Sequence, residues 1–225
     1  MQYNDIISKL KSLSDPKAVE GMARFGINSE NTFGVSVPDL RAIAKAAGKD
    51  HQLALELWES GIHEARILAS MVDVFKEVTE EQAEAWVKEF DSWDVCDQCI
   101  MNLFRYLPSA YQKAIEWGRR EEEFVRRAGF AMMASLAIGD KKADDKLFEA
   151  FFSLIVEKSD DERNFVKKAV NWALRQIGKR SFDLNKKAIQ VAEKIDRFNS
   201  KSAKWIAKDA LRELTDEKIL SRIKR

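Results

Sequence analysis

The sequence predicts an all-α protein built from stacked helical hairpins, and three observations favour this fold class. Only 3 Pro and 9 Gly occur in 225 residues, about 5% of the chain against a usual share of roughly 12%. Apolar residues recur at helical spacing along most of the chain. A helical motif also repeats at a spacing typical of α-solenoids. No segment rich in Ser, Gly or Pro separates parts of the chain, so we expect a single domain over residues 1–225.

The repeated motif has a cationic or small start followed by an Ala-rich apolar helix. It occurs as EARILASMVDVF from 64, VRRAGFAMMASLA from 125, VKKAVNWALRQIG from 166 and SAKWIAKDALREL from 202. Arg66 to Arg127 is 61 residues, Arg127 to Lys168 is 41, and Lys168 to Ala203 is 35. The first interval is about two periods, and DVCDQCIMNLFRYL occupies its middle. This period is close to that of HEAT-type repeats, in which the second helices of the hairpins line one concave face.

Charge is distributed unevenly along the sequence. Residues 1–100 carry 10 Lys or Arg and 18 Asp or Glu, a balance of −8, whereas residues 101–225 carry 28 and 19, a balance of +9. This asymmetry indicates a polyanion-binding surface, although two differently charged solvated faces would give the same count. The N-terminus lacks a signal-peptide pattern, and the longest uncharged run, residues 128–139, is too short to span a bilayer. We therefore expect a cytoplasmic protein without a membrane partner.

The stretch FDSWDVCDQC, residues 90–99, contains a C-x-x-C pair and three aspartates. Asp91 is a suitable N-cap, and Asp94 can act as its partner in a capping box. Cys96 and Cys99 fall in the apolar arc of the helix, so we expect both thiols in the core. A zinc site would need further ligands, and a thioredoxin-like pair would need a preceding strand. We therefore expect neither a metal nor a cofactor.

Asp97 differs from the other aspartates because it lies beyond the first helical turn, where capping cannot explain it. On a helical wheel it falls about 40° from Trp93, at the edge of the apolar arc. Such a position favours a side chain that faces a cleft. The alternative is a salt bridge from Asp97 to an Arg or Lys of a neighbouring hairpin.

The later helices repeat this combination of aromatic and charged side chains. Trp172 borders a cationic strip that contains Lys168 and Arg175. Arg126 and Arg127 lie in the first turn of their helix, where cations oppose the helix dipole. That placement indicates either an outside partner, such as phosphate, or pairing with an acid on the next hairpin.

Four motifs together resemble a known family. They are FGVSVPDLRAIAK at 33–45, SWDVCD at 92–97, VRRAGFAMM at 125–133 and VKKAVNWALRQ at 166–176. In this order and spacing the chain resembles, over essentially its whole length, the DNA alkylation repair proteins of the AlkD type, HEAT-like-repeat alkylpurine DNA glycosylases. The resemblance implies a catalytic carboxylate at Asp97, cleft tryptophans at Trp93 and Trp172, and a cleft arginine at Arg127. Phe25 is the aromatic nearest to the one that the family carries on an N-terminal helix.

The resemblance implies a monofunctional DNA glycosylase that hydrolyses the N-glycosidic bond of cationic N3- and N7-alkylated purines in double-stranded DNA. Such bases are already activated leaving groups, so the sugar's oxocarbenium character is what needs a carboxylate. Two indole faces add cation–π attraction. We expect a monomer whose phosphate contacts come from six cations: Arg66, Arg126, Lys167, Lys168, Arg175 and Lys204. The alternative is a non-catalytic solenoid that binds DNA or a protein partner through a basic groove.

Overall fold

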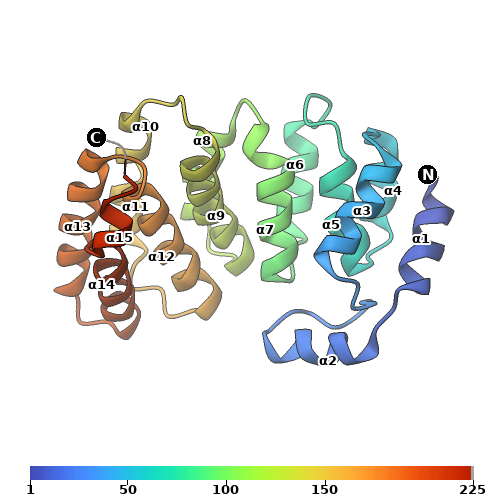
Figure 1. The fold of residues 1–225 in the computed structure, drawn as a ribbon, viewed down its shortest axis with the longest axis horizontal. Coiled ribbons are helices and arrows are strands. Elements are labelled where there is room, and N and C mark those ends of the chain that lie inside the picture. Colours follow the sequence, from blue (N-terminus) through green and yellow to red (C-terminus); the bar gives the residue numbers. More distant parts are fainter. Residues whose placement is uncertain (224–225) are drawn as a thin grey trace. The chain divides into compact units, whose positions relative to one another are not determined.

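The computed structural model describes residues 1–223, which form helices and contain no β-strand (Figure 1). The predicted all-α fold of stacked helical hairpins is therefore confirmed. The chain separates into two compact units, residues 1–107 and residues 108–225, and each is described by itself. The single domain expected over residues 1–225 stays a prediction. None of the helices in residues 1–223 has the length and apolar character that a bilayer span requires.

Unit 1 contains seven α-helices and one short 3₁₀-helix. These are α1 (Tyr3–Ser12), α2 (Pro16–Arg24), α3 (Val37–Ala47), α4 (His51–Glu59), α5 (His63–Val72), α6 (Glu80–Lys88), α7 (Trp93–Asn102) and η1 (Phe104–Tyr106). Helix α3 packs against α5 and α5 against α7, so these three form one row, while α4 forms a hairpin with α5. Helix α2 runs across the axes of these three helices (Figure 1).

The helix starts in unit 1 follow from short polar side chains at the N-cap. Ser36, Asp50 and Thr79 each accept a hydrogen bond from the backbone N–H three residues on, which satisfies a donor that has no partner within the helix. Behind the row, Trp58 of α4 stacks on Trp86 of α6 with ring centroids 4.1 Å apart. The buried indoles thereby tie successive hairpins together.

Unit 2 contains the remaining eight helices among the described residues. These are α8 (Ala110–Arg119), α9 (Glu123–Gly139), α10 (Asp145–Glu149), α11 (Phe152–Glu157), α12 (Asn164–Gly178), α13 (Phe182–Asp196), α14 (Lys201–Leu214) and α15 (Glu217–Leu220). Helix α9 packs against α12 and α12 against α14, which gives a second row, with α8 and α13 as hairpin partners of α9 and α14. The four predicted motif helices are α5, α9, α12 and α14, so their existence is confirmed.

Helices α8 and α9 touch backbone to backbone, which requires a glycine at position 129. A Cβ placed on Gly129 would lie 2.2 Å from the backbone nitrogen of Gly118 and 2.8 Å from the carbonyl oxygen of Ala114. No side chain can occupy that space. Gly129 therefore sets how closely the first hairpin of unit 2 can pack.

Candidate functional site

Helix α7 begins one residue later than the sequence suggested. Its N-cap is Ser92, and the prediction that Asp91 caps the helix is wrong, because Asp91 instead accepts a hydrogen bond from the side-chain amide of Asn28 at 2.6 Å. Asp94 has the structural role that we predicted, with different partners. Its carboxylate accepts hydrogen bonds from the Ser92 hydroxyl at 2.6 Å and from the Val95 backbone N–H at 3.0 Å.

Asp94 also pairs with a buried histidine on the neighbouring helix. The Nε2 atom of His63, which begins α5, lies 2.9 Å from the Asp94 carboxylate. Burial alone would lower the pKa of His63, but the hydrogen bond to Asp94 and the charges of Asp94, Glu64 and Asp91 raise it overall. Burial would likewise raise the pKa of Asp94, and the contacts with His63, Ser92 and Val95 lower it overall. The start of α7 is therefore held to α5 by an ion pair.

This pair makes stability depend on pH. Because the pKa of His63 is raised in the folded protein, its stabilising contribution is fully present below pH 6.5, its ordinary pKa. This contribution is lost as the pH rises through the folded-state pKa. Because the pKa of Asp94 is lowered in the folded protein, its stabilising contribution is fully present above pH 3.8, its ordinary pKa. This contribution is lost as the pH falls through the folded-state pKa. We expect His63→Gln to cost about 1 kcal/mol more at about pH 5.5 than at about pH 8.5. Urea unfolding at both pH values measures this, and an equal cost at both would contradict it.

The two cysteines of the C-x-x-C pair lie in the core of unit 1, as predicted. Cys96 and Cys99 are both fully buried and neither forms a disulfide. Burial raises the pKa of the Cys99 thiol far above its usual value, so the reactive thiolate is suppressed. Within residues 1–223, no group of three or more His, Cys, Asp and Glu side chains is arranged to hold a metal ion.

Asp97 lies one turn after Trp93 on α7, at the margin of the core. Its neighbours Val95, Cys96 and Cys99 are fully buried, whereas Asp97 keeps 9% of its surface exposed. Trp93 is half-buried, and its indole N–H donates a hydrogen bond to the backbone carbonyl of Phe25 at 3.2 Å. The Phe25 side chain is 74% exposed. Trp93 and Asp97 are thus one turn apart on α7, and the backbone of Phe25 lies against the Trp93 indole.

A buried glutamate, which the sequence reasoning missed, fixes the loop between α2 and α3. Glu64 is fully buried and its carboxylate accepts hydrogen bonds from three successive backbone N–H groups, those of Phe33, Gly34 and Val35, at 2.6 to 3.2 Å. Gly34 has a φ of +79°, which suits only glycine well. No sequence pattern signals this role, because the partners are backbone groups some 30 residues earlier.

In unit 2, Arg127 projects from the first turns of α9 to the start of α12. It is 6% exposed, and its guanidinium donates a hydrogen bond to the Phe165 carbonyl at 2.8 Å. The rings of Phe124 and Phe165 stack beside it, with centroids 5.6 Å apart. Trp172 lies two turns further along α12 and is half-buried. Arg127 and Trp172 are therefore carried by adjacent helices of one row.

Arg126, which we predicted to contact phosphate, pairs instead with acids of unit 2. Its guanidinium lies 2.7 Å from Asp161, just before α12, and 2.7 Å from Glu121. Burial would raise the pKa of Asp161, but hydrogen bonds from Arg163 and Arg126 lower it to about 2. Arg126 is 5% exposed. Of the two alternatives for its position, an outside partner or an acid on the next hairpin, the structure therefore shows the second.

The other predicted phosphate contacts divide into two groups. Arg66 pairs with Glu89 at 2.9 Å and lies over the Trp58 ring, and Arg175 pairs with Asp209 and Glu213 of α14. Both arginines are partly buried, and each forms an ion pair with an acid outside its own helix. The second group contains the three lysines, of which Lys168 and Lys204 are exposed and Lys167 is half-buried. Lys167 lies over the Trp205 ring, and Lys204 pairs weakly with Asp196 at 3.7 Å.

The spacing of charged and aromatic residues on α14 indicates further site residues. The first residues of α12 and α14, Asn164 and Lys201, are 37 residues apart. On each helix a tryptophan follows an exposed lysine by four residues: Trp172 follows Lys168, and Trp205 follows Lys201.

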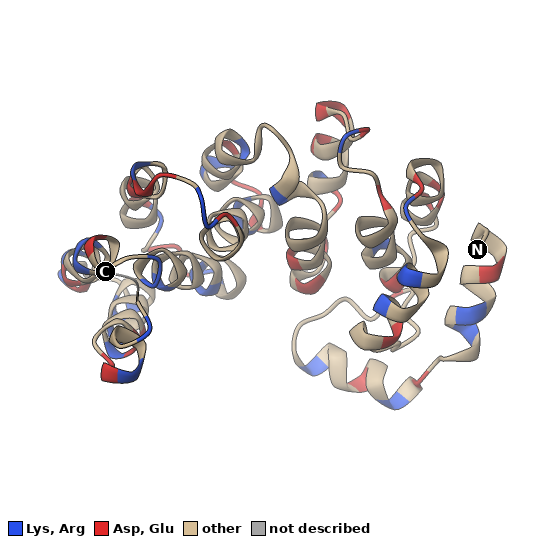
Figure 2. Ribbon diagram, turned by 45° about the horizontal axis from the view of Figure 1, so that its top comes forward, with Lys and Arg blue, Asp and Glu red and all other residues tan. Residues whose placement is uncertain are grey.

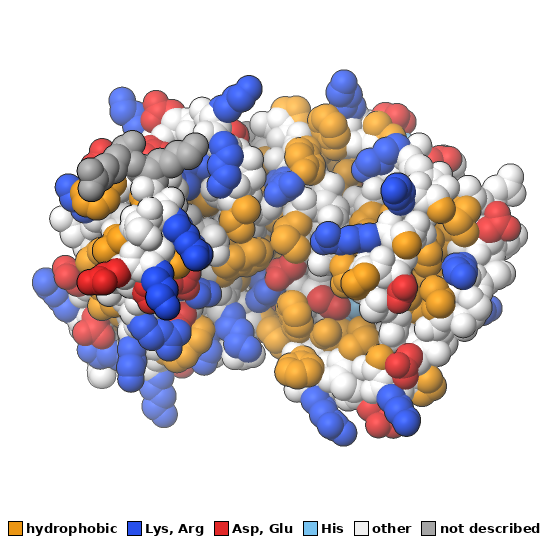
Figure 3. All heavy atoms as spheres, in the orientation of Figure 1, with side chains coloured by type: hydrophobic (Ala, Val, Ile, Leu, Met, Phe, Trp, Pro, Cys, Tyr) orange, Lys and Arg blue, Asp and Glu red, His pale blue; other side chains and the backbone are white. Residues whose placement is uncertain are grey.

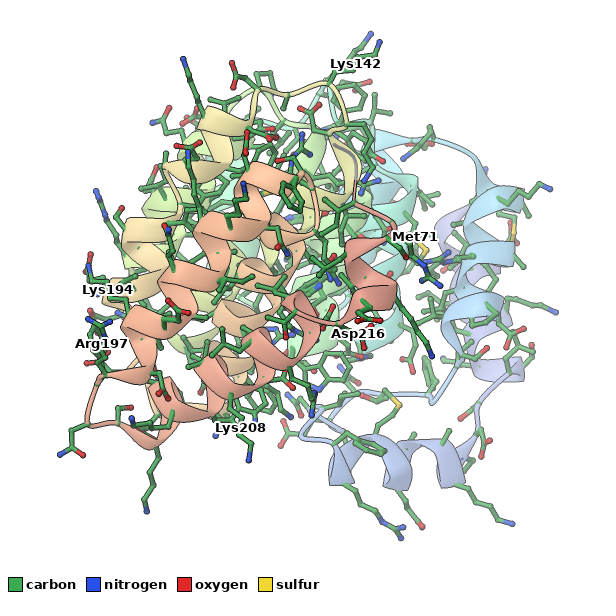
Figure 4. All side chains as sticks on the ribbon, turned by 60° about the vertical axis from the view of Figure 1, so that its left-hand side comes forward. Met71, Lys142, Lys194, Arg197, Lys208 and Asp216 are labelled. Atoms are coloured by element: carbon green, nitrogen blue, oxygen red, sulfur yellow. The ribbon has the colours of Figure 1, made fainter. Side chains whose placement is uncertain are left out.

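Trp205 and its lysines form an exposed counterpart of the Trp172 strip, and the sequence reasoning missed them. Trp205 is 40% exposed, and Lys201 and Lys208 flank it on α14 as Lys168 and Arg175 flank Trp172. Lys and Arg side chains gather over α13 and α14 in the space-filling view (Figure 3). Lys208 projects outward from α14 (Figure 4). The recurrence on both helices of a lysine four residues before a tryptophan was the signal that could have found this set.

Comparisons with known proteins agree with this fold. The family model described as DNA alkylation repair enzyme matches residues 6–214. An uncharacterized protein of Listeria innocua is 23% identical over 201 residues, which is 88% of each chain. A solved structure, described as a new family of proteins related to the HEAT-like repeat DNA glycosylases with affinity for branched DNA structures, aligns with a TM-score of 0.80. It is 19% identical and covers 100% of this chain and 98% of that one.

Proposed function

Because the chain belongs to the DNA alkylation repair enzyme family, we propose that it is a DNA glycosylase that excises cationic N3- and N7-alkylated purines from double-stranded DNA. The observation that carries the proposal is Asp97, a carboxylate at the margin of the core, one turn from Trp93 on α7. A carboxylate in a largely dry site stabilises positive charge far more strongly than one in water.

The chemistry follows from the charge of the substrate. An alkylated purine of this kind carries a positive charge, so its base leaves as a neutral molecule and needs little acid assistance. As the N-glycosidic bond breaks, oxocarbenium character builds on the sugar, and Asp97 would stabilise it and orient the attacking water. Trp93, one turn before Asp97 on the same helix, would add cation–π attraction and exclude water. The products are a free base and an abasic site.

Binding to DNA would rest on exposed cations of unit 2 rather than on the arginines. Lys168 is exposed on α12, and Lys201 and Lys208 are exposed on the adjacent helix α14, four residues before and three residues after Trp205. Lys167 of α12 lies over the Trp205 ring. Unit 2 carries 27 Lys or Arg against 19 Asp or Glu, whereas unit 1 carries 11 against 18. Phosphate contacts of this kind release counterions, so affinity should fall steeply with salt.

We expect Lys168→Ala to weaken duplex binding for every sequence and to lower the slope of log affinity against log salt by about 1. Trp205→Ala should weaken binding as well, since it removes an aromatic surface beside these lysines. Fluorescence anisotropy with a labelled duplex over a salt series measures both. Lys88→Ala is a matched control, because Lys88 is an exposed cation of unit 1. A salt slope of Lys168→Ala equal to that of Lys88→Ala would contradict the assignment of Lys168. Duplex binding by Trp205→Ala as tight as that of the wild type would contradict the role of Trp205.

Product analysis tests the proposed activity itself. Methylated duplex DNA is incubated with the protein, and free 7-methylguanine and 3-methyladenine are quantified by mass spectrometry. We expect both bases to be released, with DNA strands that break only after alkali treatment, because no lysine is assigned as a nucleophile. Duplex binding without base release would reject the glycosylase.

A second function is DNA binding without excision. It is favoured by the structural relative with a TM-score of 0.80, which is described as having affinity for branched DNA structures. The exposed Trp205 and its lysines are suited to DNA binding whether or not Asp97 acts on a base. Under this alternative the protein would bind DNA, branched structures included, and would release no alkylated base.

A further inference from the structure

A groove of about 450 Å³ opens on unit 1, where the middle of α3 and the C-terminal ends of α5 and α7 meet η1. Its lining comprises Arg41, Ala44, Met71, Met101, Asn102, Arg105 and Tyr106. Met71 points from α5 toward α3 (Figure 4). Met101 follows Asp97 by four residues on α7, so the groove begins about one helical turn, roughly 6 Å along the axis, beyond Asp97 on the same side.

The groove combines an aromatic wall with two arginines. Tyr106 is 49% exposed, and its ring lies 6.0 Å from that of Phe75, which is 39% exposed. The Arg105 guanidinium covers the Tyr106 ring at 4.6 Å and also donates a hydrogen bond to its hydroxyl. Exposed aromatic rings layered with a guanidinium form a surface on which a further planar group can stack.

The two arginines supply positive charge in an otherwise acidic unit. Unlike Arg66, neither Arg41 nor Arg105 forms an ion pair with an acid of residues 1–223. Seven of the 11 Lys and Arg residues of unit 1 precede residue 50, on or beside α1, α2 and α3 (Figure 2). Arg41 is exposed on α3 at one side of the groove. A ligand held here would meet a stacking surface and a guanidinium that is available to an anion.

The remaining lining suits a planar ligand as well. Met71 and Met101 provide a flexible, polarizable surface that adapts to the shape of its partner. The Asn102 side chain is held in place, because its amide donates to Ser70 at 3.3 Å and to Gln98 at 3.1 Å. The volume falls in the range of small-molecule sites. A nucleotide has both a planar base and a phosphate, and so matches the apolar, aromatic and cationic parts of the lining together.

We propose that this groove binds one unpaired nucleotide of a DNA strand, with the base against Arg105 and Tyr106 and the phosphate on Arg41. The inference rests on the proposed function only in taking DNA as the ligand. It adds that the protein prefers DNA with an unpaired segment, such as a fork, over a fully paired duplex. The unpaired segment would continue from paired DNA that is bound at the side of α7 that carries Asp97.

Two measurements test this. Fluorescence anisotropy compares a forked DNA, which has one single-stranded arm, with a fully paired duplex of the same sequence. We expect Arg41→Ala and Tyr106→Ala to lower affinity for the fork about tenfold, with little change for the duplex. Tyr106→Phe should retain fork binding, because stacking needs the ring and not the hydroxyl. Lys88→Ala, which removes one exposed cation of α6 outside the groove, should bind both DNAs like the wild type.

Photocrosslinking locates the contact independently of affinity. A 5-iodouracil in the single-stranded arm should crosslink to the peptide that contains Tyr106, and mass spectrometry identifies that peptide. Crosslinks only to unit 2, or variants that bind the fork like the wild type, would overturn the inference. If the wild type binds the duplex but shows no added affinity for the fork, this inference is wrong while the proposed function stands. Binding to neither DNA would overturn both.

Discussion

Asp97→Asn is expected to slow the release of alkylated purines by about 100-fold or more, with DNA binding retained. The substitution keeps the shape of the side chain and removes its negative charge. If Asp97 stabilises a cationic sugar, the loss falls on the chemical step. Single-turnover kinetics with enzyme in excess over a duplex that contains 7-methylguanine would isolate that step.

Asp94→Asn is the matched control, because Asp94 is an acid of the same helix three residues earlier. Its contacts with His63, Ser92 and Val95 are structural. We therefore expect Asp94→Asn to lower the free energy of unfolding and to affect excision much less. Circular dichroism of the Asp97 variant checks that it is folded. Equal loss of excision in the two variants would mean that both aspartates act only through the stability of α7.

Gly129→Ala is expected to lower the free energy of unfolding of the protein by at least about 2 kcal/mol. The added methyl group would meet the backbone of α8, at 2.2 Å from the Gly118 nitrogen and 2.5 Å from its Cα. No side-chain rotation can relieve a clash with backbone, so the two helices must separate. Urea unfolding followed by far-UV circular dichroism measures the loss.

Gly21→Ala is the matched control for this substitution. Gly21 lies within α2, and a Cβ there would have no neighbour within 4 Å. Alanine is the better helix former by about 1 kcal/mol, so Gly21→Ala should leave stability unchanged or raise it slightly. A Gly129→Ala protein as stable as the wild type would show that α8 and α9 do not pack as closely as described.

Periodicity predicted the fold because it reports burial within a single helix. The apolar spacing in VKKAVNWALRQIG, for example, requires only that one face of α12 be covered, and the structure covers it. The same argument placed Cys96 and Cys99 in the core. It did not find the contact between Gly118 and Gly129, because a glycine in a helix carries no pattern that identifies its partner.

The site was harder to predict because the role of a charged side chain depends on a partner that is distant in sequence. Arg126 and Arg127 are adjacent and chemically identical, yet Arg126 meets Asp161 and Arg127 meets the carbonyl of Phe165. Asp91 had the right residue type for a cap, and Ser92 takes that position because Asn28 holds Asp91. The resemblance to a family supplied roles for Asp97 and Trp172 that helical spacing alone left open.

The most direct test of the proposed function is the amount of free 7-methylguanine released from one duplex by the wild type and by Asp97→Asn at equal DNA occupancy. We predict release by the wild type and about 100-fold slower release by the variant. No release by the wild type, or equal rates for the two proteins, would contradict the assignment of Asp97 as the catalytic carboxylate of an alkylpurine DNA glycosylase.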